Sequence, residues 1–502
     1  MKKILKSVLF TFVLLFSFSV ALFSKATPDM LVIAQQADPK TLDPAATIDV
    51  YSHNVNLQIY DRLFDWGDGM KLENSLAERY EQKDPVTLYI KLREGVKFHN
   101  GEELTAEDVK FSLERASKAP SALTYFASID RVDILSKYEV NIVTSKPYGP
   151  LINSLAHACG SILNKKYIES GDPNMFFEPI GTGPFKYESW KAGDKFILKT
   201  NKEYFNGVPE FEGIIFRVIP ESTNRVIALE TREIDMVLNI DPIDAQIIEA
   251  SGHLKLITKP SVALLYVGMN CEKGPTADVR VRQAIVLATN TLDIVDNAFQ
   301  KRSTPAYSVI PQGVLGYEEL PPYETNIEKA KKLMAEAGYA DGLKLKYWTN
   351  ETQTRKDSGI IMQEQLKAIG IDLTIEILEW SAYLDKLSKA EHDIYMLGWP
   401  GGADPDGCLY PLFHSNNKGS AGNMSFYSNP RVDELLDTGR SSVDPAVREA
   451  AYKEAAKIIR DEVGVFAIVV PTSMLGTQDY ISGFFAYPTS MHFFRKVKKN
   501  IK

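Results

Sequence analysis

Residues 87–109 read TLYIKLREGVKFHNGEELTAEDV. The start of this stretch alternates between polar and apolar side chains over Thr87–Arg93, which predicts a strand. Gly95 and Gly101 bracket a turn, and Thr105-Ala-Glu-Asp108 has the form of a capping box at the start of a helix. The stretch therefore predicts a strand, a turn and a helix in succession, as in an α/β protein.

The second half of the chain alternates helix and strand signals, as βαβ units do. Ile327–Ala337 is predicted to be a helix that ends at Gly338, its C′ residue. Leu343–Trp348 is predicted to be a strand, and Asp357–Ile369 the next helix. Val465–Val470 is a continuous apolar run, which is typical of a strand buried on both faces.

The length of the chain predicts more than one lobe, because 502 residues are too many for one domain of roughly 150 residues. We expect two crossings between the lobes, near Val267–Asn270 and near Val469–Thr472, which together would form a hinge. The expected division is a signal peptide over 1–26, lobe I over 27–268 with an inserted subdomain at about 50–180, lobe II over 269–470, and a C-terminal return to lobe I over 471–502.

The N-terminal residues have the pattern of a secretory signal. Lys2, Lys3 and Lys6 precede an almost wholly apolar stretch over Val8–Phe23, and Ser24-Lys25-Ala26 supplies small residues for cleavage. The apolar stretch is short for a bilayer span of about 20 residues, which disfavours an uncleaved anchor. We therefore expect cleavage near Ala26 and a periplasmic location.

Charge and cysteine content restrict the function classes further. The formal net charge is −8, and loss of the lysine-bearing signal would make the mature chain more acidic, which disfavours nucleic acid as a partner. Cys159, Cys271 and Cys408 are an odd number of widely spaced cysteines, so a dense disulfide framework is not expected. We interpret them as small buried residues, with one disulfide and one free thiol as the alternative.

Eight short motifs then follow one another along the chain. They resemble, in the same order, motifs of the peptide/nickel-type (family 5) extracellular solute-binding proteins, which include dipeptide-, oligopeptide- and glutathione-binding proteins. The motifs are Asp38–Pro44, Ile59–Phe64, Leu92–Val109, Pro179–Phe185, Glu233–Val237, Met269–Asn270 with Asp278–Ala284, Lys329–Leu333 with Glu336–Tyr339, and Gly398–Trp399 with Asp404–Gly407.

This resemblance implies a fold and a mechanism. The fold would be the two-lobed α/β fold of periplasmic binding proteins, type II, with an extra subdomain in lobe I. The protein would be the solute-binding component of an ABC importer. It would capture a peptide or another small solute by hinge closure and deliver it, as a monomer, to the cognate membrane permease. No cofactor, metal ion or enzymatic activity is expected.

The resemblance is weakest where the ligand would bind. In dipeptide- and oligopeptide-binding members, an aspartate shortly after the Gly-Trp pair holds the α-amine, and dipeptide-binding members add an arginine for the carboxylate. Here Gly402 stands at the position of that aspartate, and Trp348–Asn350 contains no arginine, although Arg355 follows. The spacing of Trp399 and Asp404 is more similar to that of glutathione-binding members, so the identity of the ligand stays open.

The predicted ligand contacts combine aromatic, acidic and amide side chains. Aromatic rings would pack on the ligand and an aspartate would pair with an amine. Ordinary packing, a loop turn or a role in the hinge backbone is the alternative for individual members of this set. The candidates are Tyr51, Tyr266, Asn270, Trp399, Asp404 and Asp406.

The sequence also bears on three other functions. An oligosaccharide would favour clustered tryptophans, and the five in this chain are scattered. A nickel chelate would favour well-placed histidines, and the seven here have no metal-ligand spacing. A secreted hydrolase is the alternative from another class. The chain has no His-Glu-x-x-His, Gly-x-Ser-x-Gly or Gly-Lys-Ser/Thr motif, but carboxylates are too common for the sequence to decide on an acid–base pair.

Overall fold

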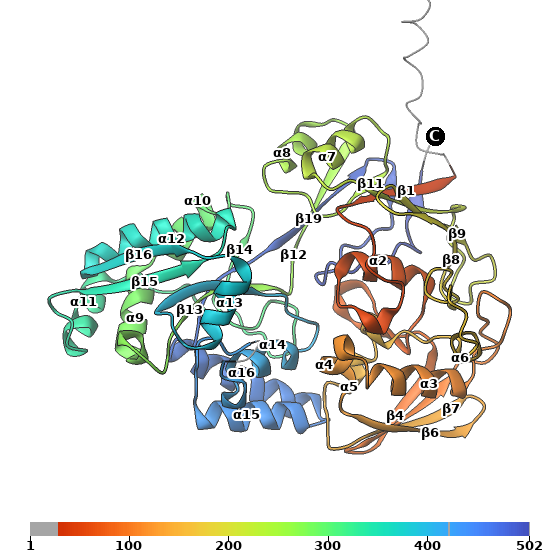
Figure 1. The fold of residues 1–502 in the computed structure, drawn as a ribbon, viewed down its shortest axis with the longest axis horizontal. Coiled ribbons are helices and arrows are strands. Elements are labelled where there is room, and N and C mark those ends of the chain that lie inside the picture. Colours follow the sequence, from red (N-terminus) through yellow and green to blue (C-terminus); the bar gives the residue numbers. More distant parts are fainter. Residues whose placement is uncertain (1–28, 420–421, 501–502) are drawn as a thin grey trace, which may run out of the picture.

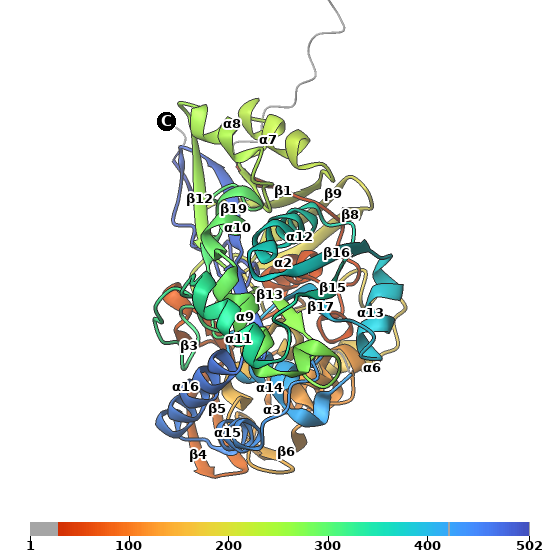
Figure 2. The same cartoon turned by 90° about the vertical axis from the view of Figure 1, so that its left-hand side faces the viewer.

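The computed structural model describes residues 29–419 and 422–500, so the predicted signal peptide over 1–26 lies outside the described residues. The chain forms two lobes that lie side by side, each built around its own sheet (Figure 1). Helices α7 (Ser222–Glu230) and α8 (Ala245–Ala250) lie at one end of the molecule in both ribbon views. The subdomain sheet lies at the other end, beside α15 (Pro430–Ser441) and α16 (Pro445–Asp461) (Figure 2).

Lobe I contains a seven-stranded mixed sheet. One face packs on α2 (Val50–Ile59) and on Phe494 near the C-terminus, and the other packs on α7 (Ser222–Glu230) and α8 (Ala245–Ala250). The strands, in spatial order, are β12 (Leu254–Pro260), β19 (Thr472–Gln478), β11 (Met236–Val237), β1 (Met30–Gln35), β10 (Gly213–Val218), β9 (Lys195–Thr200) and β8 (Phe185–Lys191).

The subdomain of lobe I has its own four-stranded antiparallel sheet and its own core. The Thr105–Asp108 capping box starts α3 as the sequence predicted, and Thr105 N–H donates to the Asp108 carboxylate at 2.9 Å. The strands are β4 (Ala77–Asp84), β5 (Thr87–Leu92), β7 (Glu139–Thr144) and β6 (Ile129–Ser136), and the helices are α3 (Ala106–Ala116), α4 (Leu123–Phe126), α5 (Leu151–Ser154) and α6 (Lys165–Glu169).

Lobe II contains a six-stranded mixed sheet with helices on both faces. The strands, in spatial order, are β14 (Thr304–Pro305), β18 (Phe466–Val470), β13 (Leu264–Met269), β17 (Ile394–Trp399), β15 (Leu343–Thr349) and β16 (Ile371–Ile377). One face is covered by α9 (Val279–Ala288), α10 (Thr291–Asn297), α11 (Ile327–Glu336) and α12 (Gln353–Leu366), and the other by α13 (Trp380–Ser388), α14 (Asp406–Phe413), α15 (Pro430–Ser441) and α16 (Pro445–Asp461).

The chain crosses between the two large sheets twice. The first crossing is the segment 261–263 between β12 and β13, and the second is Pro471 between β18 and β19. Ser261 N–H donates to the Pro471 carbonyl at 2.9 Å, so the two crossings are joined to each other. The boundary predicted at 268/269 falls inside β13, because an apolar run such as Leu264–Met269 does not reveal which sheet it joins.

Helix α2 is enclosed by other parts of lobe I. It ends at Ile59, and the chain then enters strand β2 (Phe64–Trp66). Most of α2 is buried, including the polar side chains of Ser52, Asn54 and Asn56. The helix is enclosed because it lies between the lobe I sheet and the subdomain, an environment that its sequence pattern does not specify.

Candidate functional site

The carboxyl ends of the parallel strands of lobe II lie next to the hinge. Strand β15 is parallel to both β16 and β17, so all three end at the same edge of the sheet. Trp399, the last residue of β17, pairs with Leu264, the first residue of β13 after the crossing segment 261–263. The residues that follow β15, β16 and β17 therefore lie at the edge nearest lobe I.

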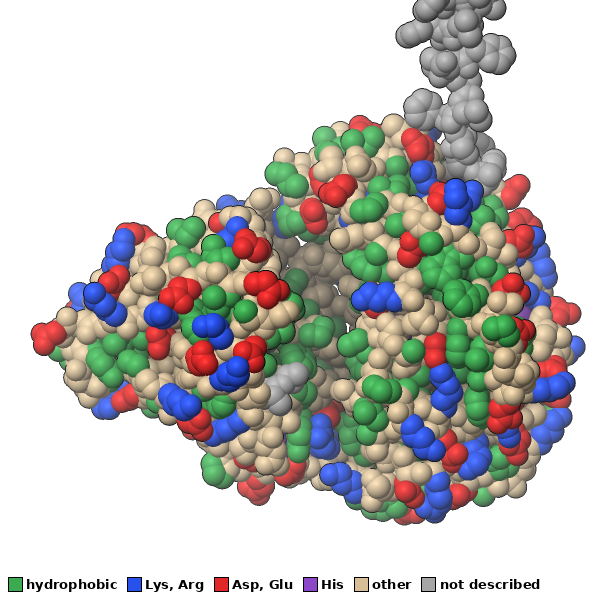
Figure 3. Space-filling model, in the orientation of Figure 1, with side chains coloured by type: hydrophobic (Ala, Val, Ile, Leu, Met, Phe, Trp, Pro, Cys, Tyr) green, Lys and Arg blue, Asp and Glu red, His purple; other side chains and the backbone are tan. Residues whose placement is uncertain are grey.

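Lobe I presents the matching edge. Strand β1 is parallel to β10 and β11, and β11 is antiparallel to β19, which starts at Thr472 just after the second crossing. The carboxyl ends of β1, β10 and β11 therefore also point toward the hinge. Figure 3 shows a hollow between the lobes. Ligands of open α/β sheets bind outside the carboxyl ends of the strands, so this interlobe cleft is the candidate site.

Arg355, in the first turn of α12, is a cation with unused donors at the lobe II edge. Its Nη1 donates to Asn350 Oδ1 at 3.1 Å, and its guanidinium carbon lies 5.8 Å from the ring centroid of Trp380. Its Nη2 would lie 3.6 Å from a Cβ built on Gly398. Among the described residues, no carboxylate pairs with Arg355, and its buried Nε has no partner. A guanidinium of this kind can bind a carboxylate through two hydrogen bonds.

Trp399 lies at the same edge, as expected for a residue that lines the cleft. It is partly exposed, and its Nε1 donates to the Gly407 carbonyl at 2.9 Å. The loop after it turns back at Gly401, where φ is +69° and a Cβ would lie 1.7 Å from the Val262 carbonyl oxygen. Only glycine allows this close approach of the loop to the hinge segment.

Asp404 and Asp406 lie in the same loop and at the start of α14, but their charges are already paired. Arg448 Nη2 donates to both oxygens of Asp404, at 2.8 and 2.9 Å, and Asn153 of the subdomain donates to Asp404 Oδ2 at 2.5 Å. Arg440 holds Asp406 with two hydrogen bonds of 2.9 and 2.8 Å. The structure therefore gives both aspartates protein partners in place of the ligand amine that we predicted.

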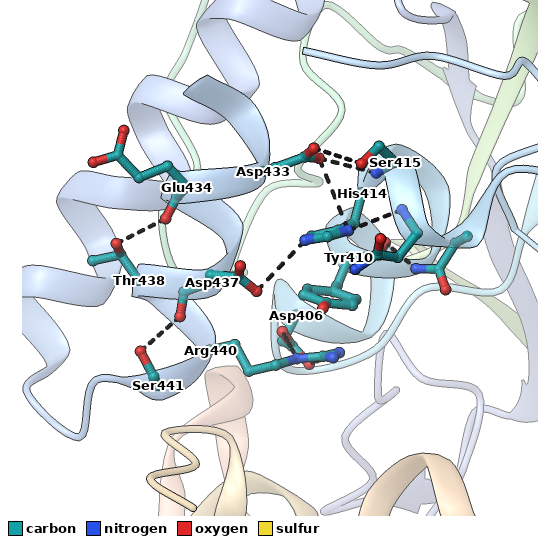
Figure 4. Close-up of polar contacts among 12 residues, drawn as sticks. Asp406, Tyr410, His414, Ser415, Asp433, Glu434, Asp437, Thr438, Arg440 and Ser441 are labelled. Carbon is teal, nitrogen blue, oxygen red and sulfur yellow. Dashed lines mark hydrogen bonds and ion pairs between the residues drawn. The ribbon is translucent and has the colours of Figure 1, made fainter. Parts of the chain in front are cut away.

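The surroundings of Asp406 explain why it is buried. Figure 4 shows Asp406, Tyr410 and Arg440 together between α14 and α15, and the Arg440 guanidinium carbon lies 3.2 Å from the Tyr410 ring centroid. Burial raises the pKa of Asp406, and the hydrogen bonds and charge of Arg440 oppose this effect. Gly149 N–H of the subdomain also donates to the Arg440 carbonyl at 2.8 Å, so this region is where lobe II touches the subdomain.

Tyr51 lies at the lobe I edge of the cleft. Its hydroxyl donates to Gln36 Oε1 at 2.7 Å, directly after β1. Burial raises the pKa of Tyr51, and a hydrogen bond with Asn239 and the charge of Arg225 lower it. Arg225 Nη2 donates to the carbonyl of Asn239 at 2.6 Å, and Asn239 has the left-handed φ of 57°. Gln36, Tyr51 and Asn239 thus form a polar edge that faces the hinge.

Two predicted contacts lie inside lobe II. Tyr266 is 1% exposed and packs edge to face with Tyr395 in the core, because its side of β13 is covered by α13 and α14. Asn270 is also 1% exposed, and its amide bonds only backbone groups, among them the carbonyls of Ala390 and His392. Both residues stabilise lobe II and do not reach the cleft, which corrects their prediction as ligand contacts.

Sequence reasoning did not select Arg355, Gln36 or Asn239 as site residues. All three are polar residues that follow the carboxyl end of a strand, and one of these strands, β15, was predicted as Leu343–Trp348. Their position after a strand end was the sequence signal that could have identified them, because residues that follow parallel strands gather at one edge of the sheet. Without knowing the strand order, the sequence did not show which strand ends face each other.

The comparisons with known proteins agree with this geometry. A sequence model described as "Bacterial extracellular solute-binding proteins, family 5 Middle" matches residues 71–420. The chain belongs to this family. The resemblance and the two-lobed fold predicted from the eight motifs are thereby confirmed. This family 5 protein is the solute-binding component of an ABC importer.

Three relatives match this family 5 protein over nearly its whole length. It is 30% identical over 483 residues to the glutathione-binding protein GsiB of Salmonella typhi, covering 94% of each chain. The structure of HbpA2 from Haemophilus parasuis has a TM-score of 0.87 at 29% identity, covering 94% of this chain and all of that one. DppA from Helicobacter pylori, solved with the peptide STSA, has a TM-score of 0.76 at 28% identity, covering 94% and 98%. Within residues 29–419 and 422–500, no helix has the length and apolarity needed to span a membrane.

Proposed function

We propose that the ligand is a short peptide or a peptide-like molecule such as glutathione, bound in the interlobe cleft with a free carboxylate on Arg355. The Arg355 guanidinium at the carboxyl edge of the lobe II sheet, which has no carboxylate partner among the described residues, is the observation that carries this proposal. Relatives named for glutathione binding, or solved with a peptide, support the same ligand class.

The two edges of the cleft would contact different parts of the ligand. Arg355 would neutralise the carboxylate, which would otherwise be costly to bury. Trp399 would pack on the ligand from lobe II, and Tyr51 with Asn239 would offer a ring and hydrogen bonds from lobe I. Contacts to both lobes would stabilise the closed form by hinge motion at 261–263 and Pro471. The protein would act as a monomer in the periplasm, after cleavage near Ala26, and would release its ligand unaltered to the permease.

Calorimetric titration tests the carboxylate assignment. The mature protein is titrated with reduced glutathione and with di-, tri- and tetrapeptides, each as the free acid and as the C-terminal amide. Saturable binding of one acid per protein is expected, with the amide weaker by about 10–100-fold, since hydrogen bonds to charged groups contribute about 1.5–3 kcal/mol. Equal binding of acid and amide would contradict the role of Arg355, and absence of binding to every peptide would contradict the ligand class.

A second measurement tests the absence of catalysis. The protein is incubated with isotopically labelled forms of whichever peptides bind. Recovery of intact peptide in stoichiometric complex is expected, and product formation over many turnovers would show that the protein is a hydrolase.

A further inference from the structure

Two histidines and a cysteine that are distant in sequence come together where α2 meets the 3₁₀ turn η4 (Ala158–Gly160). His53 lies in α2, and His157 and Cys159 lie at η4. One potential ligand atom from each residue lies within 4.8 Å of the others, and His53 Nε2 is 3.9 Å from Cys159 Sγ. The absence of metal-ligand spacing in the sequence therefore did not exclude a metal-ligand cluster in the fold.

The surrounding contacts hold these side chains in place. The ring of Tyr125 stacks on His157 with centroids 3.8 Å apart, and Cys159 N–H donates to His157 Nδ1 at 3.2 Å. Cys159 Sγ donates to the Thr47 carbonyl at 3.3 Å. His53 is 1% exposed, and its Nδ1 has no hydrogen-bond partner among the described residues. Nε2, the other ring nitrogen of His53, faces Cys159 Sγ and is the atom available to a metal ion.

The ligand atoms of the cluster, two imidazole nitrogens and one sulfur, are suited to a metal ion of intermediate softness. Imidazole nitrogen and thiolate sulfur are ligands that Zn²⁺ prefers. With Zn–N of about 2.0–2.1 Å and Zn–S of about 2.3 Å, tetrahedral coordination places the nitrogen and sulfur ligands about 3.6 Å apart. The observed 3.9 Å between His53 and Cys159 requires only a small contraction.

We propose that His53, His157 and Cys159 bind one Zn²⁺ ion, with solvent as the fourth ligand. The ion replaces the hydrogen on Cys159 Sγ, a zinc–sulfur bond forms, and one proton passes to solvent. His157 is partly exposed and gives the ion a route to the site. Because α2 packs in the main core of lobe I and η4 packs in the subdomain core, the ion joins these two parts of the lobe.

Cobalt spectroscopy tests the site without a substitution. Reduced, metal-free mature protein is titrated with Co²⁺ without oxygen, and the near-ultraviolet thiolate-to-cobalt charge-transfer band is recorded. The band is expected to saturate at one equivalent and to disappear when Zn²⁺ is added. A wild-type protein that shows no such band would overturn the proposal.

Matched cysteine variants identify the thiolate. The structure records Cys159, Cys271 and Cys408 as free thiols. Cys408 is a suitable control because it is as well buried as Cys159, and its thiol donates only to the Val309 carbonyl at 3.8 Å. Cys159→Ser is expected to abolish the band, and Cys408→Ser to retain it. A band that persists in Cys159→Ser contradicts the site, whatever its effect on folding.

The histidines are tested by affinity for Zn²⁺, measured by competition with a chelator. Even outer-shell partners of metal ligands change affinity by about 10–100-fold, so His157→Gln is expected to weaken Zn²⁺ binding by about 100-fold or more. His99→Gln is the control, because His99, like His157, is partly exposed, and its Nε2 bonds the Gly183 carbonyl and is not part of the cluster. Equal Zn²⁺ affinity in both variants would contradict the proposal.

Discussion

Two groups of charged residues in lobe II lie close to the end of β17. They differ in whether their charges are paired within the protein. In the closed region, Asp404 and Asp406 are buried against Arg448 and Arg440 where lobe II meets the subdomain. In the open region, Arg355 stacks near Trp380 and has no carboxylate partner among the described residues. An aspartate whose charge the fold already pairs is therefore a weaker candidate for a ligand contact than an arginine without a carboxylate partner.

The largest expected effect concerns the closed region. Asp404→Asn leaves the Arg448 guanidinium buried without a counter-charge, since the two side chains are 11% and 6% exposed. Loss of one partner from a buried ion pair is expected to lower the free energy of unfolding by about 3–5 kcal/mol, measured by urea denaturation. Ligand affinity of the folded fraction is expected to change little.

The control is Asp385→Asn, which breaks an exposed ion pair with Lys389 and is expected to cost less than about 1 kcal/mol. If Asp404→Asn keeps wild-type stability but loses ligand binding, then Asp404 is the ligand anchor and the comparison is wrong.

The open region is tested by Arg355→Gln. Because Arg355 has no carboxylate partner among the described residues, the substitution breaks no ion pair there. The free energy of unfolding of the variant is therefore expected to stay within about 0.5 kcal/mol of wild type. Affinity for a carboxylate-bearing peptide is expected to fall by about 10–100-fold, from the loss of about 1.5–3 kcal/mol in charge-assisted hydrogen bonds. Lys356→Gln removes the next cation on α12 and serves as the control. Equal affinities of the two variants would show that the carboxylate lies elsewhere.

The loop between these regions is tested by two glycines. At Gly401, φ is +69° and a Cβ would lie 1.7 Å from the Val262 oxygen, whereas a Cβ at Gly402 meets nothing nearer than 3.8 Å. Gly401→Ala is expected to cost about 1–3 kcal/mol of stability and to alter the hinge, and Gly402→Ala to cost less than about 0.5 kcal/mol. Similar melting temperatures for both variants would contradict this difference.

The sequence predicted the fold well because its local signals agree with the tertiary structure. The capping box at Thr105, the glycine Gly338 after α11 and the apolar run of β18 each depend on a few neighbouring residues. The boundary of lobe I was misplaced because an apolar strand such as β13 has the same sequence pattern in either sheet. Strand order depends on contacts between distant segments, which one sequence does not display.

The candidate site was harder to predict for the same reason. Asp404 and Asp406 follow a tryptophan and glycines, as ligand residues often do, but their pairing with Arg448 and Arg440 depends on helices that begin 24 or more residues later. Tyr266 stands in a continuous apolar run, so its sequence is compatible with either face of the sheet. The cluster of His53, His157 and Cys159 could not be found from the sequence either, since only the fold brings α2 and η4 together.

The smallest expected effect is that of Tyr51→Phe, which is compared with Tyr266→Phe. The sequence placed both tyrosines among the candidate ligand contacts. Tyr51→Phe removes one hydroxyl at the cleft edge, where it bonds Gln36, but keeps the ring. A single hydrogen bond contributes about 0.5–1.5 kcal/mol, so ligand affinity is expected to fall by less than about tenfold, with stability almost unchanged. Tyr266→Phe is the matched control in the lobe II core, and it is expected to change the unfolding free energy and leave the affinity unchanged. Calorimetric titration and urea denaturation of both variants separate the two roles.

The contrary outcome is that Tyr266→Phe weakens binding more than Tyr51→Phe. The core tyrosine must then reach the ligand through a rearrangement of lobe II. In that case the edge formed by Gln36, Tyr51 and Asn239 would not be the lobe I half of the site.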